Sequence, residues 1–164
     1  MRYLVFFAIL AVATGSIIIA VRSHDAKIKK LITEGKALQR ERTFWLQQTL
    51  FTTQIDSVDG VYHATNKPLL DEAGVKHEID SDSIILFTNK ASGGSFTSTL
   101  RAVGQNDGKF QYIYQIDQYQ GPDGYMKPKC LRAANILLTS IEKAFLQLDS
   151  DTSVIRRTAA FKQK

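Results

Sequence analysis

Cysteine and proline are scarce in this 164-residue chain, and charge is missing from one long stretch of it. The single cysteine, Cys130, excludes an internal disulfide. None of the three prolines lies in residues 1–67, and no charged residue lies between Tyr3 and Val21. Such a run predicts a helix about 28 Å long, close to the roughly 30 Å hydrocarbon core of a bilayer.

Sequence patterns that would indicate an enzyme or a metal site are also missing. The acidic segment Glu78 to Asp82 lacks the glycine and the terminal glutamate of a calcium loop. Cys130 has no histidine arranged with it as in a catalytic thiolate site. The three histidines lie far apart and have no histidine or cysteine at metal-binding spacing: His24, His63 and His77. We therefore expect no catalytic residue, no metal ligand and no cofactor.

The uncharged run has two interpretations, a retained helix and a cleavable signal peptide. Ala11-Val12-Ala13 has the small-x-small form of a signal-peptide cleavage site. However, the stretch from Ile17 to Val21 resumes the hydrophobic run at once, so cleavage would leave an apolar terminus. We expect residues 1–22 to form a retained hydrophobic helix, in a membrane or inside an assembly.

Positive charge is concentrated directly after this run. The chain has a net charge of +5, and residues 22–42 hold seven basic against three acidic residues, a surplus of four. This surplus can form a solvated helix face or contact anionic lipid headgroups. No nucleic-acid-binding motif accompanies it, so no nucleic-acid partner is expected. Positive residues after a span favour a domain on the cytoplasmic side.

Apolar residues then recur at helical spacing as far as Ile55. This pattern predicts an amphipathic extension over residues 23–57 and a nearly continuous helix of about 50 residues. Gly15 is the point at which the apolar half bends most readily. Asp59-Gly60 is expected to end the helix as a turn. The predicted organisation is a core helix over residues 1–22, its extension over 23–57 and a globular α+β domain over 58–164.

Within the globular domain, a short helix is predicted from Pro68, capped by Thr65 or Asn66 and ended by Gly74. The later elements are predicted as strands over 83–88, 95–103 and 110–116 in an antiparallel meander, a helix over 129–148, and an edge strand or free tail over 154–164. The expected fold class is thus α+β. A long N-terminal helix packs on a small antiparallel sheet that also carries a C-terminal helix.

Four segments follow one another in the order and spacing of a known family. They are FAILAVATGSIIIAVRSHDAKIKKL, YHATNKPLLDEAGV, LFTNKASGGSFTSTL, and FQYIYQID followed by CLRAANILLTSI. In this arrangement the chain resembles a type IV pilin, closest to the type IVb branch, across roughly residues 1–148. The resemblance implies a structural subunit of a pilus filament that has no active site.

The resemblance also implies partners, locations and packing residues. The subunit would polymerise with copies of itself, assisted by the pilus assembly machinery. It would lie in the inner membrane before assembly and in an extracellular filament afterwards. The implied assembly residues are Met1, which would be the methylated amino terminus, Val5, Gly15 and Trp45, with Cys130 as a structural thiol.

Two features depart from the family pattern. Val5 stands where pilins carry a glutamate, which indicates either a minor or initiating subunit or a protein outside the family. The C-terminal disulfide of the family needs a second cysteine, and this chain has only Cys130. The alternative is a single-span inner-membrane accessory protein whose soluble domain binds a partner, as the positive flank suggests.

Overall fold

The computed structural model of the chain describes residues 19, 22–91, 94–121 and 126–158. A helix over residues 22–33 comes first. The later elements are η1 (Phe44–Leu46), β1 (Gln47–Thr53), α2 (Val58–Ala64), α3 (Lys67–Glu72), β2 (Val75–Ser81), β3 (Ile84–Ala91), β4 (Gly94–Asn106), β5 (Lys109–Gln120), α4 (Pro128–Leu148) and β6 (Ser153–Thr158). All six strands form one antiparallel sheet in the order β2-β3-β4-β5-β1-β6.

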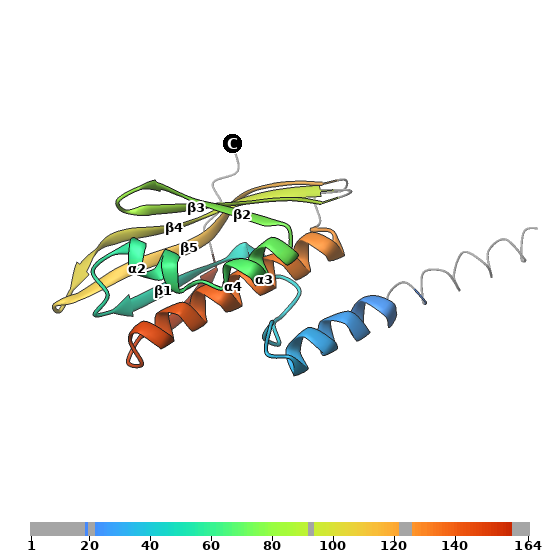
Figure 1. Ribbon diagram of the computed structural model, residues 1–164, viewed down its shortest axis with the longest axis horizontal. Coiled ribbons are helices and arrows are strands. Elements are labelled where there is room, and N and C mark those ends of the chain that lie inside the picture. The colour runs from blue at the N-terminus through green and yellow to red at the C-terminus, as the bar shows by residue number, and fades with distance from the viewer. Residues whose placement is uncertain (1–18, 20–21, 92–93, 122–125, 159–164) are drawn as a thin grey trace, which may run out of the picture.

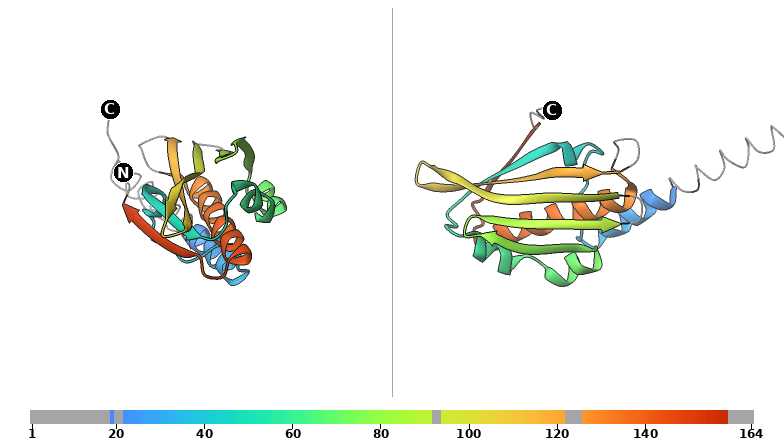
Figure 2. Two further views of the ribbon diagram at one scale, coloured as in Figure 1. Left: turned by 90° about the vertical axis from the view of Figure 1, so that its left-hand side faces the viewer. Right: turned by 90° about the horizontal axis from the view of Figure 1, so that it is seen from above.

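The molecule has two layers. Helices α2, α3 and α4 lie against one face of the sheet, which we call the inner face (Figure 1). Seen from the opposite side, the strands lie in front of α4, and no described helix covers this outer face (Figure 2). A single layer of helices therefore buries one face of the sheet and leaves the other accessible.

The core forms where the two-residue period of the strands meets the apolar side of α4. Alternate residues Phe51, Phe87 and Tyr112 point inward and are almost fully buried. Phe145 of α4 stacks on Phe51 with 4.3 Å between ring centroids, and both rings are 0% exposed. This pair joins the helix directly to a central strand.

The predicted fold class is wrong about its main element, the long N-terminal helix. The described helix ends at residue 33, where Gly35 adopts a left-handed conformation with φ +68° and closes the helix end. Residues 47–53 were expected to continue the helix, but they form β1 between β5 and β6. The reason is that Thr49, Phe51 and Thr53 are buried at strand spacing and pair with segments distant in sequence.

The element that packs along the sheet is α4. Its 21 residues bury a continuous stripe that includes Leu137, Ile141 and Phe145. No helix within the described residues has the length and hydropathy needed to cross a bilayer. The predicted span over residues 1–22 falls almost wholly outside the residues described.

Several shorter elements lie close to their predicted positions. The three predicted strands correspond to β3, β4 and β5, and the C-terminal helix begins at Pro128. Asn66 caps α3 by accepting a hydrogen bond from the Leu69 amide. Asp59-Gly60 lies inside α2 and does not end a helix. Strand β2 was not predicted, and β6 forms the opposite edge of the sheet.

Asp149 ties the end of α4 to the end of β1. Its Oδ2 accepts hydrogen bonds from Thr53 Oγ1 at 2.6 Å and from the Gln54 amide at 2.8 Å. Its Oδ1 accepts from the Asp151 amide at 3.0 Å. These hydrogen bonds, the one from Thr53 first, lower the pKa of Asp149 from 3.8 to about 2.

We expect Phe145→Ala to lower the free energy of unfolding by about 3–5 kcal/mol, because it leaves a cavity beside Phe51. Leu146→Ala is the matched control, because Leu146 is the next residue on the same helix and is 46% exposed. Urea denaturation of both variants measures the difference. Similar losses in the two variants would contradict the core placement of Phe145.

We expect Asp149 to stabilise the fold in its charged form. Its pKa is depressed in the folded state, so the stabilisation is complete above 3.8 and is lost as the pH falls through about 2. The thermal midpoint of Asp149→Asn should therefore lie below that of the parent chain near neutral pH, and the gap should close in acid. Asp151→Asn, which keeps the same backbone amide, is the control. A gap independent of pH would refute this role.

Candidate functional site

A short extended segment joins the first helix to the sheet and lies along α4. We call residues 34–43 the connector. Asn135 of α4 holds it by accepting from the Leu38 amide at 3.3 Å and donating from Nδ2 to the Leu38 carbonyl at 2.9 Å. Thr139 Oγ1 also accepts from the Leu38 amide, at 3.2 Å. These contacts fix the connector without any secondary-structure pairing.

A buried ion pair reinforces the same junction. The guanidinium of Arg40 donates to both carboxylate oxygens of Glu142, at 3.2 and 2.7 Å. The side chains are only 3% and 6% exposed. Arg156 of β6 adds a third contact at 2.8 Å to the same carboxylate. One carboxylate on α4 thus binds both the connector and the edge strand of the sheet.

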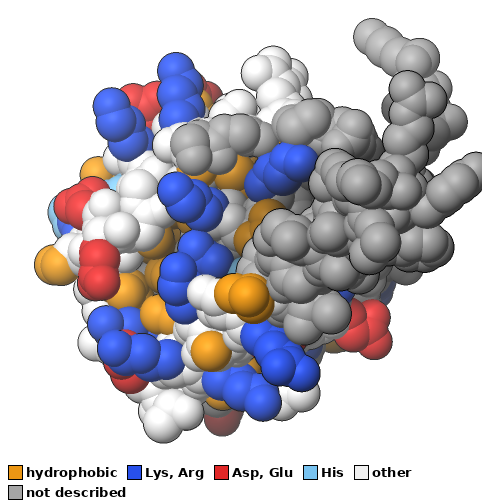
Figure 3. Space-filling model, turned by 90° about the vertical axis from the view of Figure 1, so that its right-hand side faces the viewer, with side chains coloured by type: hydrophobic (Ala, Val, Ile, Leu, Met, Phe, Trp, Pro, Cys, Tyr) orange, Lys and Arg blue, Asp and Glu red, His pale blue; other side chains and the backbone are white. Residues whose placement is uncertain are grey.

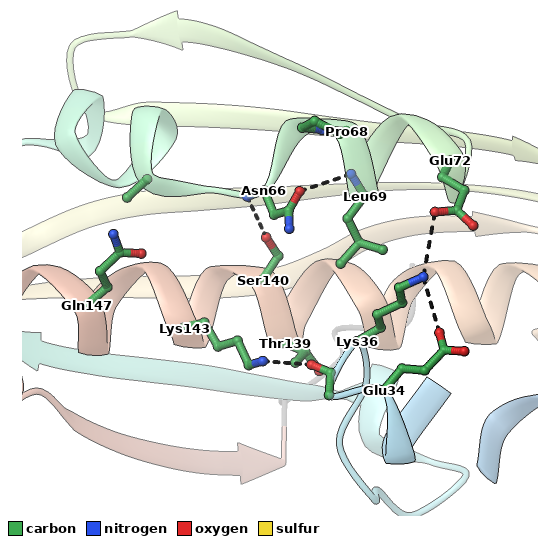
Figure 4. Close-up of a pocket in the computed structure, with 12 residues that line it drawn as sticks. Glu34, Lys36, Asn66, Pro68, Leu69, Glu72, Thr139, Ser140, Lys143 and Gln147 are labelled. Atoms are coloured by element: carbon green, nitrogen blue, oxygen red, sulfur yellow. Dashed lines mark hydrogen bonds and ion pairs between the residues drawn. The ribbon is translucent and has the colours of Figure 1, made fainter. Parts of the chain in front are cut away.

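A polar cavity of about 500 Å³ opens beside this junction, between the connector, α3 and α4 (Figure 4). Lys143 Nζ donates to the Gly35 carbonyl at 2.7 Å. Lys36 lies between the carboxylates of Glu34 and Glu72, at 3.2 and 3.9 Å. The hydrogen bond and charge of Glu34, followed by the charge of Glu72, raise the pKa of Lys36. Lys36 therefore remains protonated at neutral pH, when it cannot act as a base or nucleophile.

The neutral groups of the cavity are similarly engaged. Ser140 Oγ accepts from the Asn66 amide at 3.0 Å, and Asn66 Oδ1 caps α3 through the Leu69 amide (Figure 4). Ser140 has no histidine among the cavity-lining residues to activate it. The residues around the cavity connect the first helix to the domain. Those that the structure describes form no catalytic constellation.

The residues considered for chemistry in the sequence are not brought together. Cys130 is fully buried in the first turn of α4, and burial raises the pKa of its thiol, so it is not an activated nucleophile. His24 lies 3.0 Å from Arg132, and burial together with that cation lowers its pKa. No group of three potential metal ligands occurs among the described residues.

An arginine, Arg101, lies near the middle of the outer face of the sheet. Arg101 of β4 pairs in register with Ile113 of β5 and Ile84 of β3, so its side chain lies between two aliphatic ones. Leu50 of β1 and Leu86 of β3 extend the same face. Arg101 Nε is buried and has no hydrogen-bond partner, and no carboxylate among the described residues pairs with the guanidinium.

Of the residues predicted to pack or assemble, the structure describes Trp45 and Cys130. Trp45 lies in η1, is partly buried against the core and stands 5.7 Å from the ring of Tyr119. Met1, Val5 and Gly15 lie outside the described residues. Cys130, predicted as a structural thiol, is a free cysteine that is buried in the first turn of α4.

Sequence reasoning missed the charged residues that organise the structure. Glu142 could have been noticed because it lies next to Ile141, on the apolar side of the predicted helix. Arg101 could have been noticed as the one charge in the strand pattern SFTSTLRAV. Nothing in the sequence connects Arg40 with Glu142, because 102 residues separate them.

Comparisons with protein-family models, with curated proteins and with solved structures found no match to this chain. The resemblance to pilins therefore remains a prediction from the sequence.

We expect Glu142→Gln to lower the free energy of unfolding by about 3–5 kcal/mol, because it leaves the Arg40 charge buried without a counter-charge. The double variant Arg40→Met, Glu142→Leu should recover much of this loss, because an apolar pair of similar volume removes both charges. Chemical denaturation of the single variants Arg40→Met and Glu142→Leu and of the double variant measures the coupling. Strictly additive losses would contradict a direct interaction.

Proposed function

We propose that this protein is a membrane-tethered binding protein without enzymatic activity, and that it docks a protein partner on the outer face of its sheet. The observation that carries the proposal is Arg101, whose guanidinium lies at the centre of an uncovered face and forms no ion pair with a carboxylate of the described residues. The partner that fits is one that presents a carboxylate surrounded by apolar side chains.

The surroundings of Arg101 favour binding over simple solvation. A buried Nε without an acceptor is costly, and a bidentate carboxylate can satisfy it. Ile84 and Ile113 flank the guanidinium and would exclude water from such a contact. Central arginines ringed by apolar neighbours are typical of the residues that dominate binding energy at protein interfaces.

The uncharged first segment and the helix that follows it support a membrane tether. Tyr3 to Val21 contain no charge, and the helix over residues 22–33 follows directly. The connector binds this helix to the domain through Leu38 and the Arg40–Glu142 pair. The domain is thereby held in one orientation relative to the first helix, with its outer sheet face accessible.

The second candidate is a filament subunit. The four pilin-like segments of the sequence, which follow one another in the family's order, support it. However, a pilin spine needs the amphipathic half of the first helix to run on through residue 57, and the helix ends near Gly35. A partner-binding module does not need that continuity.

We expect a photo-crosslinking residue at Thr99, two positions from Arg101 on the same face, to form an adduct with a partner protein in membranes of the source organism.

Arg101→Glu should weaken association with the identified partner by about thirtyfold, because loss of a central arginine costs about 2 kcal/mol. Lys109→Glu, at the β4–β5 turn, reverses one charge away from this site and is the control. Affinity measured with the purified partner gives the ratio.

Two outcomes would overturn the proposal. Equal binding by Arg101→Glu and the parent chain would show that the guanidinium does not bind the partner. Adducts formed only between copies of this chain would favour the filament subunit.

A further inference from the structure

The first helix and α4 run side by side in the same direction. His24 contacts Arg132 near their starts, at 3.0 Å, and the Gly35 carbonyl accepts from Lys143 further along, at 2.7 Å. Both contacts join residues that are 108 apart in sequence, so residue 22 lies level with Cys130, in the first turn of α4. The first helix therefore begins at the end of the domain where α4 begins.

Three strand ends meet at this same end of the domain. Lys90 at the end of β3 pairs with Ser95 at the start of β4, which pairs with Gln120 at the end of β5. A Cβ placed on Gly94 would lie 3.4 Å from Cys130 Sγ in the first turn of α4. The start of α4, the strand ends at Lys90, Ser95 and Gln120, and the first helix thus form one surface, which we call the proximal end.

Positive charge gathers on the proximal end. Lys76, Lys90 and Lys129 are exposed there, as are Arg22 and Lys29 of the first helix. Lys76 and Lys90 form no ion pair with a carboxylate among the described residues, although Asp71 lines the same cavity. In Figure 3 lysine and arginine side chains surround hydrophobic ones on this side, and acidic side chains lie toward the rim.

The cavity between these lysines has a largely apolar lining, which includes Val75 and Phe96, and polar groups at its edges that suit a phosphate. It has a volume of about 640 Å³, and Thr88, Ser95 and Thr97 add hydroxyls to the ammonium groups of Lys76 and Lys90. Trp45 and Tyr119 contact each other at the same end, where β1 begins and β5 ends. Partly buried tryptophan and tyrosine beside lysine are typical of surfaces at the headgroup level of membranes.

We propose that the proximal end docks on an anionic phospholipid surface, with the lysine-lined cavity receiving headgroup phosphates. This inference rests on the membrane tether of the proposed function. Helix rises 1.5 Å per residue, so a helix that leaves the bilayer near residue 22 holds this end within about one Debye length, ~8 Å, of the headgroups. At that distance each lysine favours the docked state by about fivefold.

The single tryptophan of the chain makes the docking directly measurable. The full-length protein is reconstituted in vesicles of phosphatidylcholine alone or mixed with phosphatidylglycerol, each with a nitroxide on a fraction of the headgroups. We expect stronger quenching of Trp45 fluorescence in the anionic vesicles, and we expect added salt to reduce the difference. Lys90→Glu should reduce the docked population by about fivefold or more, whereas Lys109→Glu at the far turn should not.

Flotation of the same vesicles after carbonate washing separates the two claims. A chain that stays inserted but is quenched equally in neutral and anionic vesicles would overturn the docking and leave the tether standing. A chain removed by carbonate would overturn the tether. Docking would then survive only if the chain still bound anionic vesicles and Lys90→Glu abolished that binding. Equal quenching of Lys90→Glu and Lys109→Glu would assign the effect to the first helix and overturn the docking surface.

Discussion

The buried contact between Arg40 and Glu142 is the interaction on which the arrangement of this protein depends. The connector has no strand or helix partner, so its position relative to α4 is set by side chains: Asn135, Thr139 and this ion pair. Glu142 also holds Arg156 of β6. A single carboxylate therefore links the first helix, the long helix and one edge of the sheet, and its burial makes the loss of any one partner costly.

The two faces of the sheet differ because a single layer of helices covers only one of them. One layer of helices is enough to bury the aromatic inner face, where Phe51 stacks on Phe145. No described helix remains for the outer face, which keeps threonine and glutamine beside a few aliphatic residues and Arg101. The two proposed surfaces also differ in chemistry. The middle of the outer face offers one guanidinium among aliphatic side chains, whereas the proximal end offers several exposed lysines suited to a charged, fluid surface.

Local sequence patterns were sufficient to predict the elements whose structural neighbours are close in sequence. Strands β3, β4 and β5 form a meander with short turns, Asn66 caps α3, and the apolar stripe of α4 has a clear helical period. The prediction failed at β1 because Leu46 and Leu50 fit a helical period while Thr49, Phe51 and Thr53 fit a strand. Its true partners, β5 and β6, are far along the chain, and only their pairing decides between the two patterns.

The sequence by itself determined the uncharged first segment, the basic stretch after it, the meander, the long C-terminal helix and the lack of a recognisable catalytic motif. Each of these depends on composition or on neighbours a few residues away. Tertiary structure decided where the first helix ends, that β1 joins the sheet, that Arg40 meets Glu142 and that Arg101 faces outward without a partner among the described residues. These features depend on contacts between distant segments, whose energies appear only when the chain is folded.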